Sequence, residues 1–238
     1  MTDLAASLRE LSIANRILAR EGVVDGFGHV TIRHPDKPAH FLMARSRSPA
    51  LVTPDDIMTF GPDGEPPASD ARRPYAERFI HAAMYEARPE VMAVIHNHSP
   101  SLIPFGVTKA RLRPILHMAG CIGEDVKVWD IRRKFGDTNL LVINMAHGRD
   151  LAAMHGRNRM TLMRGHGCTI TGLTLQDAVI TAVYAEVNAR LQMQAMALGD
   201  VEYMTSGEVA RTTEMVAMPL AVDRVWEYFV ARADCSGI

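Results

Sequence analysis

The chain has 238 residues, of which 47% are hydrophobic, and its formal net charge is −1 at pH 7. A chain of this size can bury a substantial core, and its balanced charge gives no electrostatic reason to bind nucleic acid or an anionic membrane. The three cysteines include no C-x-x-C pair, and the acid-containing N-terminal segment does not have the pattern of a signal peptide. We therefore expect a cytoplasmic protein that binds neither nucleic acid nor membranes.

Helical and strand-like patterns alternate along the chain. The spacing of apolar residues predicts helices at 3–21, 74–88, 174–198 and about 220–233. It predicts strands at 29–33, 40–44, 57–60, 91–95, 139–144 and 161–165. No repeat or linker divides the sequence, so we expect one α/β domain over residues 1–238, with helices on the faces of a mixed sheet.

The stretch VIHNHSP at 94–100 places two histidines directly after a buried strand. Side chains two positions apart on an extended chain point to one face, so His96 and His98 can hold one divalent ion while Asn97 faces away. A polar turn that happens to contain histidines is the alternative explanation. The choice between them depends on other ligands elsewhere in the chain.

Two further segments offer such ligands. In LMRGHGC at 162–168, His166 lies between two glycines that allow a sharp turn at a strand end. Glu77 lies in the expected helix just before the strand at 91–95, although exposed helical glutamates are common. Three imidazoles and one carboxylate would complete a divalent site. His81, four residues after Glu77, is expected to pack beside this site as a supporting residue.

In this order and spacing, the segments resemble the class II aldolase/adducin family, which has the fold of the L-fuculose-phosphate aldolases. The likeness runs from about residue 8 to the final helix and is carried by GHVTIR, PYAERFIHAAMYEARPEVMAVIHNH and LMRGHGCTITG. It implies a single domain whose mixed, mainly antiparallel sheet is flanked by helices. It also implies that the metal ligands are Glu77, His96, His98 and His166, that Glu77 moves protons, and that His29 contacts the substrate.

The phosphate pocket of the family's aldolases is altered in this chain. Those enzymes hold the phosphate with a Thr-Gly pair in an early loop and a Ser-Ser pair before the catalytic glutamate. Here Arg45 and Ser46 replace the first pair, and Tyr75 followed by alanine replaces the second. Arg45 and Arg47 would suit a carboxylate, because the planar guanidinium matches it with two hydrogen bonds. A solvated loop is the alternative for either arginine.

A second difference lies at RLRPILHMAG, 111–120, where the aldolases carry a tyrosine that reaches a neighbouring active site. No tyrosine is present here, and His117 is the residue of this stretch that can transfer a proton at neutral pH. A packed or turn histidine is the alternative. The same region is similar to the decarboxylase branch of the family.

These features favour a metal-dependent carbon–carbon lyase that decarboxylates a hydroxylated aromatic, pyridine or muconate-type dicarboxylate through an enolate-like intermediate. In this hypothesis Glu77 or His117 supplies the proton, Arg45 or Arg47 anchors a second carboxylate, and the ion is Zn²⁺, Mn²⁺ or Co²⁺. The alternatives are an aldolase acting on a sugar phosphate or hydroxy acid, and an adducin-like interaction module without catalysis. The resemblance also implies a homotetramer with active sites between subunits.

Overall fold

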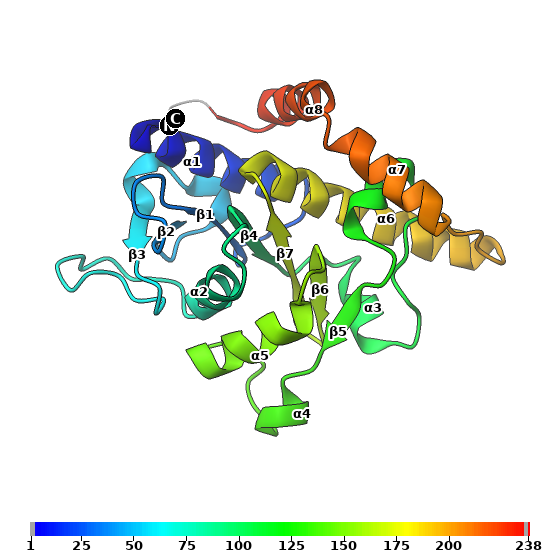
Figure 1. Ribbon diagram of the computed structural model, residues 1–238, viewed down its shortest axis with the longest axis horizontal. Coiled ribbons are helices and arrows are strands. Elements are labelled where there is room, and N and C mark those ends of the chain that lie inside the picture. Colours follow the sequence, from blue (N-terminus) through cyan, green and yellow to red (C-terminus); the bar gives the residue numbers. More distant parts are fainter. Residues whose placement is uncertain (1–2, 236–237) are drawn as a thin grey trace.

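One seven-stranded sheet forms the centre of the computed structural model, which describes residues 3–235 and 238 (Figure 1). Its strands are β1 (His29–Arg33), β2 (Phe41–Ala44), β3 (Ile57–Phe60), β4 (Ala93–Asn97), β5 (Lys127–Trp129), β6 (Met160–Met163) and β7 (Gly167–Gly172). Their order is β3-β2-β1-β4-β7-β6-β5, and every neighbouring pair is antiparallel except β5 and β6. The expected mixed, mainly antiparallel α/β fold is confirmed.

Helices and short 3₁₀ turns surround the sheet. The helices are α1 (Leu4–Arg20), α2 (Arg78–Ala87), α3 (Ile103–Val107), α4 (Arg132–Phe135), α5 (Met145–His155), α6 (Leu175–Leu198), α7 (Ser206–Val216) and α8 (Pro219–Arg232). The 3₁₀ turns are η1 (Pro49–Leu51), η2 (Pro54–Asp56) and η3 (His117–Ile122). The Thr174 hydroxyl accepts a hydrogen bond from the Asp177 N–H and caps α6, so this helix begins where its sequence predicts.

Two hydrophobic cores lie on opposite faces of the sheet. On one face α1 and α6 cover the strands with fully buried apolar residues such as Leu11, Ile17 and Val179. On the other face α2 and α5 cover them with residues such as Ile80 and Leu151 (Figure 1). Because both faces are covered, the central strands are buried, and polar side chains at their ends lie in a protected environment.

The predicted strand at 139–144 is wrong. Leu140 has a φ of 67°, which interrupts any extended run. Local hydrogen bonds hold the turn, since the side chains of Thr138 and Asn139 accept from the backbone N–H groups of Leu140 and Leu141. Asn144 then caps α5, a helix that the sequence reasoning missed.

The expected helix at 74–88 also begins later than its pattern suggests. Residues 74–75 are irregular and 76–77 form a turn, so Glu77 is the N-cap residue of α2 instead of a residue within the helix. Within the residues described here, no helix combines the length and apolar character needed to cross a membrane.

Candidate metal centre and substrate cavity

Four side chains that could ligate a metal converge from separate elements. Glu77 lies at the start of α2, and His96 lies in β4. His98 directly follows the end of β4, and His166 lies in the turn between β6 and β7. One potential ligand atom of each residue lies within 4.8 Å of those of the other three. The fold therefore brings the four predicted ligands together.

The distances within this cluster fit a divalent ion. The Nε2 atoms of His96 and His98 are 3.0 Å apart, and Glu77 Oε2 lies 3.6 Å from Nε2 of His96 and 3.3 Å from Nε2 of His166. Ligand atoms about 2.0–2.2 Å from one tetrahedral zinc ion would lie about 3.3–3.6 Å from one another. Three imidazole nitrogens and one carboxylate oxygen at this spacing form a complete donor set.

Hydrogen bonding and burial prepare the imidazoles to donate lone pairs. The Cys168 carbonyl can only accept, so the His96 Nδ1–H donates to it at 3.1 Å and leaves Nε2 unprotonated in the neutral ring. Burial lowers the pKa of His96, and burial together with repulsion from His96 and His166 lowers the pKa of His98 to about 4. Both rings are therefore neutral at pH 7.

Glu77 remains a carboxylate in this buried site. Burial would raise its pKa, but the adjacent imidazoles of His166 and His96 outweigh burial and hold the pKa far below its usual range. Its second oxygen, Oε1, accepts a hydrogen bond of 2.9 Å from the Val142 N–H. The loop that was expected to be a strand thus orients the carboxylate of the cluster.

A chain of buried polar side chains supports the cluster from behind. His29 pairs with His96 across β1 and β4, and its Nδ1 lies 2.7 Å from Nε2 of His81. His81 Nδ1 lies 2.8 Å from the Thr31 hydroxyl, which lies 2.9 Å from the Tyr85 hydroxyl. Burial, together with repulsion from His96, lowers the pKa of His81 to about 3. His81 therefore supports the site as a neutral ring.

A cavity of about 390 Å³ opens beside the cluster. The lining residues for which substrate contacts were predicted are His29, Ser46, Arg47 and Tyr75, and the candidate ligands Glu77 and His98 also line it. Phe27, Leu141 and Ala76 add apolar surface to the same cavity. The cavity therefore combines ligand atoms, an arginine, hydroxyl groups and aromatic rings.

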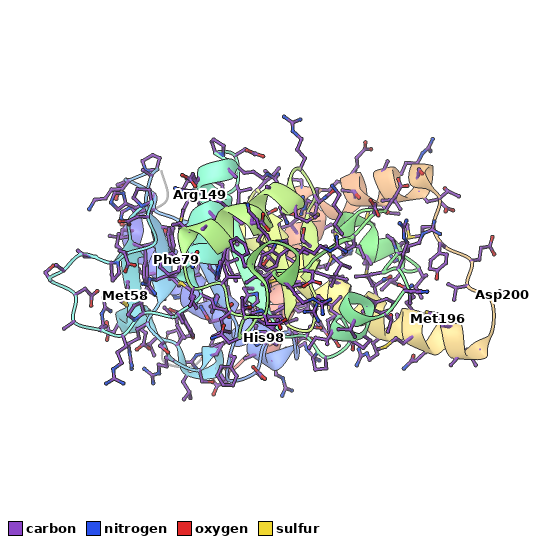
Figure 2. The ribbon with its side chains drawn as sticks, turned by 90° about the horizontal axis from the view of Figure 1, so that it is seen from below. Met58, Phe79, His98, Arg149, Met196 and Asp200 are labelled. Atoms are coloured by element: carbon purple, nitrogen blue, oxygen red, sulfur yellow. The ribbon has the colours of Figure 1, made fainter. Side chains whose placement is uncertain are left out.

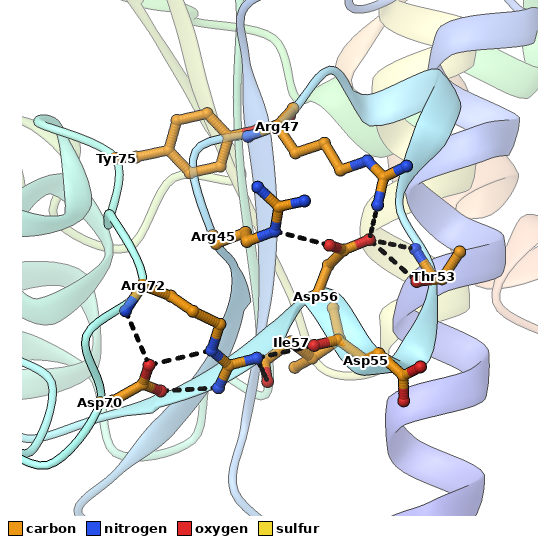
Figure 3. A network of polar contacts seen from close by, with 9 residues as sticks. All are labelled: Arg45, Arg47, Thr53, Asp55, Asp56, Ile57, Asp70, Arg72 and Tyr75. Carbon is orange, nitrogen blue, oxygen red and sulfur yellow. Dashed lines mark hydrogen bonds and ion pairs between the residues drawn. The ribbon is translucent and has the colours of Figure 1, made fainter.

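Arg45 and Arg47 both bind the buried carboxylate of Asp56 (Figure 3). Arg45 Nε and one terminal nitrogen of Arg47 each donate to it at 2.7 Å, and the Thr53 N–H and hydroxyl donate at 2.9 Å. Burial would raise the pKa of Asp56, but these donors lower it to about 2. The Tyr75 hydroxyl donates to the Arg47 carbonyl, so it is the Tyr75 ring that packs against the neighbouring His29.

Two predicted site residues stand apart from this cavity. Arg45 is not among its lining residues, and it contributes through Asp56. His117 is exposed at the start of η3 and lines a separate cavity with Tyr184 and Arg224. Within one chain, His117 therefore does not join the four-residue cluster.

Three contributors were missed by the sequence reasoning. Thr31 was assigned only to a strand, although it bridges His81 and Tyr85. Val142 contributes only a backbone N–H, which no residue pattern identifies. Phe27 precedes Gly28 in the early loop, and an aromatic residue between two glycines could have drawn attention to it.

Comparison with known proteins places the chain in a family and finds relatives that are decarboxylases. Residues 9–193 match the family model described as class II aldolase and adducin N-terminal domain. The decarboxylase tropJ of Talaromyces stipitatus is 32% identical over 248 residues, which cover 93% of this chain and 92% of that protein. A 3,4-dihydroxyphthalate decarboxylase from Terrabacter sp. is 28% identical over 83% of this chain and 84% of its own length.

Aldolases are similar as well. A 5-methylthioribulose-1-phosphate/5-deoxyribulose-1-phosphate aldolase from Rhodospirillum rubrum is 31% identical over 84% of this chain and 91% of its own length. The solved structure of an L-fuculose 1-phosphate aldolase from Glaciozyma antarctica superposes with a TM-score of 0.79 at 24% identity, over 96% of this chain and 88% of that one. At this identity the superposition shows a shared fold.

Proposed function

The chain is a lyase of the class II aldolase and adducin family, and we propose that it is a metal-dependent decarboxylase of a hydroxylated aromatic, pyridine or muconate-type dicarboxylate. The observation that carries this proposal is the cavity itself, which is lined both by Glu77 and His98 of the donor cluster and by Arg47. Relatives named as decarboxylases, among them one that acts on 3,4-dihydroxyphthalate, support the reaction class.

The metal would be held by Glu77, His96, His98 and His166. A divalent ion bound there supplies Lewis-acid stabilisation of the negative charge that develops as a carbon–carboxylate bond breaks. We propose Zn²⁺ or Mn²⁺, with Co²⁺ as a further possibility, because this donor set does not select among them.

The chain's own residues orient the substrate. One terminal nitrogen of Arg47 donates a hydrogen bond to Asp56. The remaining N–H groups of its guanidinium can donate to a second carboxylate of the substrate. Ser46 and the ring of Tyr75 complete this end of the cavity, and His29 contributes at the end near His96. Arg45 also binds Asp56 and so helps to fix the carboxylate that positions Arg47.

We assign proton transfer to Glu77 within one chain. The bond between ring carbon and carboxylate breaks, its electron pair stays with the ring and the adjacent oxygen, and carbon dioxide leaves. The Glu77 carboxylate would first take the proton of the substrate's hydroxyl group on Oε2 and then pass it to the ring carbon, while the Val142 N–H keeps Oε1 in place. His117 would take this role only from a neighbouring subunit.

We further propose a cytoplasmic homotetramer whose active sites lie between subunits. The cytoplasmic assignment is supported by Cys121, Cys168 and Cys235, which are all free thiols. A tetramer would allow His117 of one subunit to approach the cavity of another. Light scattering of the purified protein measures the subunit number.

Aldol cleavage is the second candidate, because the Rhodospirillum rubrum aldolase is 31% identical over 84% of this chain, against 32% over 93% for tropJ. Both reactions break a carbon–carbon bond and place charge on an oxygen beside the metal. They differ in the leaving group, which is carbon dioxide in one reaction and an aldehyde in the other.

The test is a product assay on the metal-reconstituted protein. Ortho-hydroxy aromatic, pyridine and muconate dicarboxylates are screened for carbon dioxide release, and fuculose and rhamnulose phosphates are screened beside them for trapped aldehyde. Release of carbon dioxide from one dicarboxylate, lost in His96→Ala, supports the decarboxylase. Formation of an aldehyde from a sugar phosphate, without carbon dioxide release from any dicarboxylate, would refute the decarboxylase and support the aldolase.

A further inference from the structure

Phe27 is an exposed aromatic residue at the rim of the candidate substrate cavity. Its side chain is 71% exposed, and it is one of the cavity's lining residues. Large apolar side chains gain free energy when they are covered. An aromatic ring left open at the edge of a ligand cavity therefore offers a contact surface to whatever enters.

The backbone holds Phe27 beside the metal ligands. The Phe27 N–H donates a 2.8 Å hydrogen bond to the Asp25 carboxylate, and the ring centroid lies 6.3 Å from that of His98. Gly28 has a φ of 86°, and a Cβ there would lie 2.8 Å from Val24 and 3.1 Å from the His96 carbonyl. Because only glycine fits that close approach, the loop is fixed against β4 with Phe27 next to the cluster.

The chemistry of the cavity selects a ligand with a flat apolar face. Tyr75 and Leu141 line the cavity together with Phe27, while Glu77 and His98 present ligand atoms. A substrate that places its oxygens toward the donor cluster would leave its body against these apolar side chains. An aromatic ring can stack on the phenylalanine ring, whereas an aliphatic hydroxy acid has no aromatic face to offer.

We propose that Phe27 is a specificity-determining residue that stacks on the ring of an aromatic hydroxy-acid substrate. This inference rests on the proposed decarboxylase and narrows its substrates to aromatic acids over aliphatic ones. Phe27 contributes binding and orientation, and it takes no part in proton transfer.

The test compares ligand binding in variants of Phe27. The probes are 2,3-dihydroxybenzoate, which is aromatic, and malate, which is an aliphatic hydroxy acid, each titrated calorimetrically into the zinc-loaded protein. We expect Phe27→Ala to weaken 2,3-dihydroxybenzoate about tenfold and to change malate by less than about twofold. The affinity of Phe27→Leu for 2,3-dihydroxybenzoate should lie between those of Phe27→Ala and the wild type. Phe27→Trp should bind this probe like the wild type, and its indole fluorescence should change on binding.

Leu198→Ala is the matched control. Leu198 is 90% exposed at the end of α6 and lines none of the cavities described above. Met196 and Asp200, which flank it in sequence, lie far from His98 in Figure 2. This variant should bind both probes as the wild type does.

Three results would overturn the proposal: unchanged 2,3-dihydroxybenzoate binding in Phe27→Ala, an equal loss for both probes, or a changed subunit number on light scattering. The last would mean that Phe27 packs against a second copy of the chain. Ring-selective binding without carbon dioxide release from any dicarboxylate would remove the proposed function and leave the role of Phe27 in place. Carbon dioxide release with wild-type affinity in Phe27→Ala would remove only that role.

Discussion

Replacing Gly167 by alanine should weaken the metal site without changing any of its four ligands. A Cβ at position 167 would lie 2.0 Å from the Asn97 carbonyl oxygen and 3.2 Å from the His98 Cα. Since non-bonded atoms normally stay about 3.5 Å apart, β4 and β7 would have to separate by about 1 Å or more at this point. His98 and His166 lie on either side of this contact, so their ring nitrogens would move apart.

The expected magnitudes follow from that displacement. Metal ligands must hold their distances to about 0.2 Å, and changes in supporting residues typically cost about 10–100-fold in metal affinity. We therefore expect the zinc Kd of Gly167→Ala to rise by about 10–100-fold. The free energy of unfolding of the metal-free variant should fall by about 1–3 kcal/mol, as for other overpacked sites.

Chelator competition measures the zinc Kd, and urea unfolding measures the stability. The control is Gly207→Ala in α7, where an added Cβ meets nothing within 4 Å. That variant should keep the wild-type Kd and gain up to about 1 kcal/mol, because alanine favours a helix over glycine. A wild-type zinc Kd in Gly167→Ala would show that the close approach of β4 and β7 does not position the ligands.

Three further predictions test the surroundings of the site. The pKa of Asp56 falls from 3.8 to about 2 on folding, so Asp56→Asn should cost about 2 kcal/mol at pH 7. Because the pKa of Asp56 is lower in the folded protein, its carboxylate stabilises the folded state at pH values above the unfolded pKa. The cost measured by urea unfolding should therefore shrink between pH 4 and pH 2, and a constant cost would contradict the ion pairs. Thr31→Val leaves His81 and Tyr85 without their shared partner and should lower the free energy of unfolding by about 1–3 kcal/mol, and no loss would argue against the buried chain. Metal removal should lower the Tm, and zinc at 100 times its Kd should restore about 2.7 kcal/mol, whereas a Tm indifferent to zinc would count against a metal site.

The elements that the sequence predicts best are those with a strong local pattern. The periodicity of α1 and α6 and the apolar run before His96 are set by burial against the sheet, so they are visible in the letters. The segment at 139–144 is apolar too, but the side chains of Thr138 and Asn139 bind its backbone and turn it into a loop. Such competition between local hydrogen bonds and strand pairing cannot be read from hydrophobicity alone.

The site divides in a similar way. The four candidate ligands were identifiable because their residue types and order match a known pattern, and the fold brings them together. The residues that support them were not, because Val142 acts through its backbone and Thr31 through a contact between β1 and α2. The pairing of Arg45 and Arg47 with Asp56 was also hidden, since it depends on how the loop after β2 folds back.

The most direct measurement of the central claim is carbon dioxide release during metal titration of the chelator-treated protein, with an aromatic ortho-hydroxy dicarboxylate as substrate. If Glu77, His96, His98 and His166 form the catalytic metal centre, the rate should rise from near zero, saturate at one ion per chain, and stay near zero in His96→Ala at every metal concentration. A full rate before metal is added, or a rate that His96→Ala retains, would contradict it.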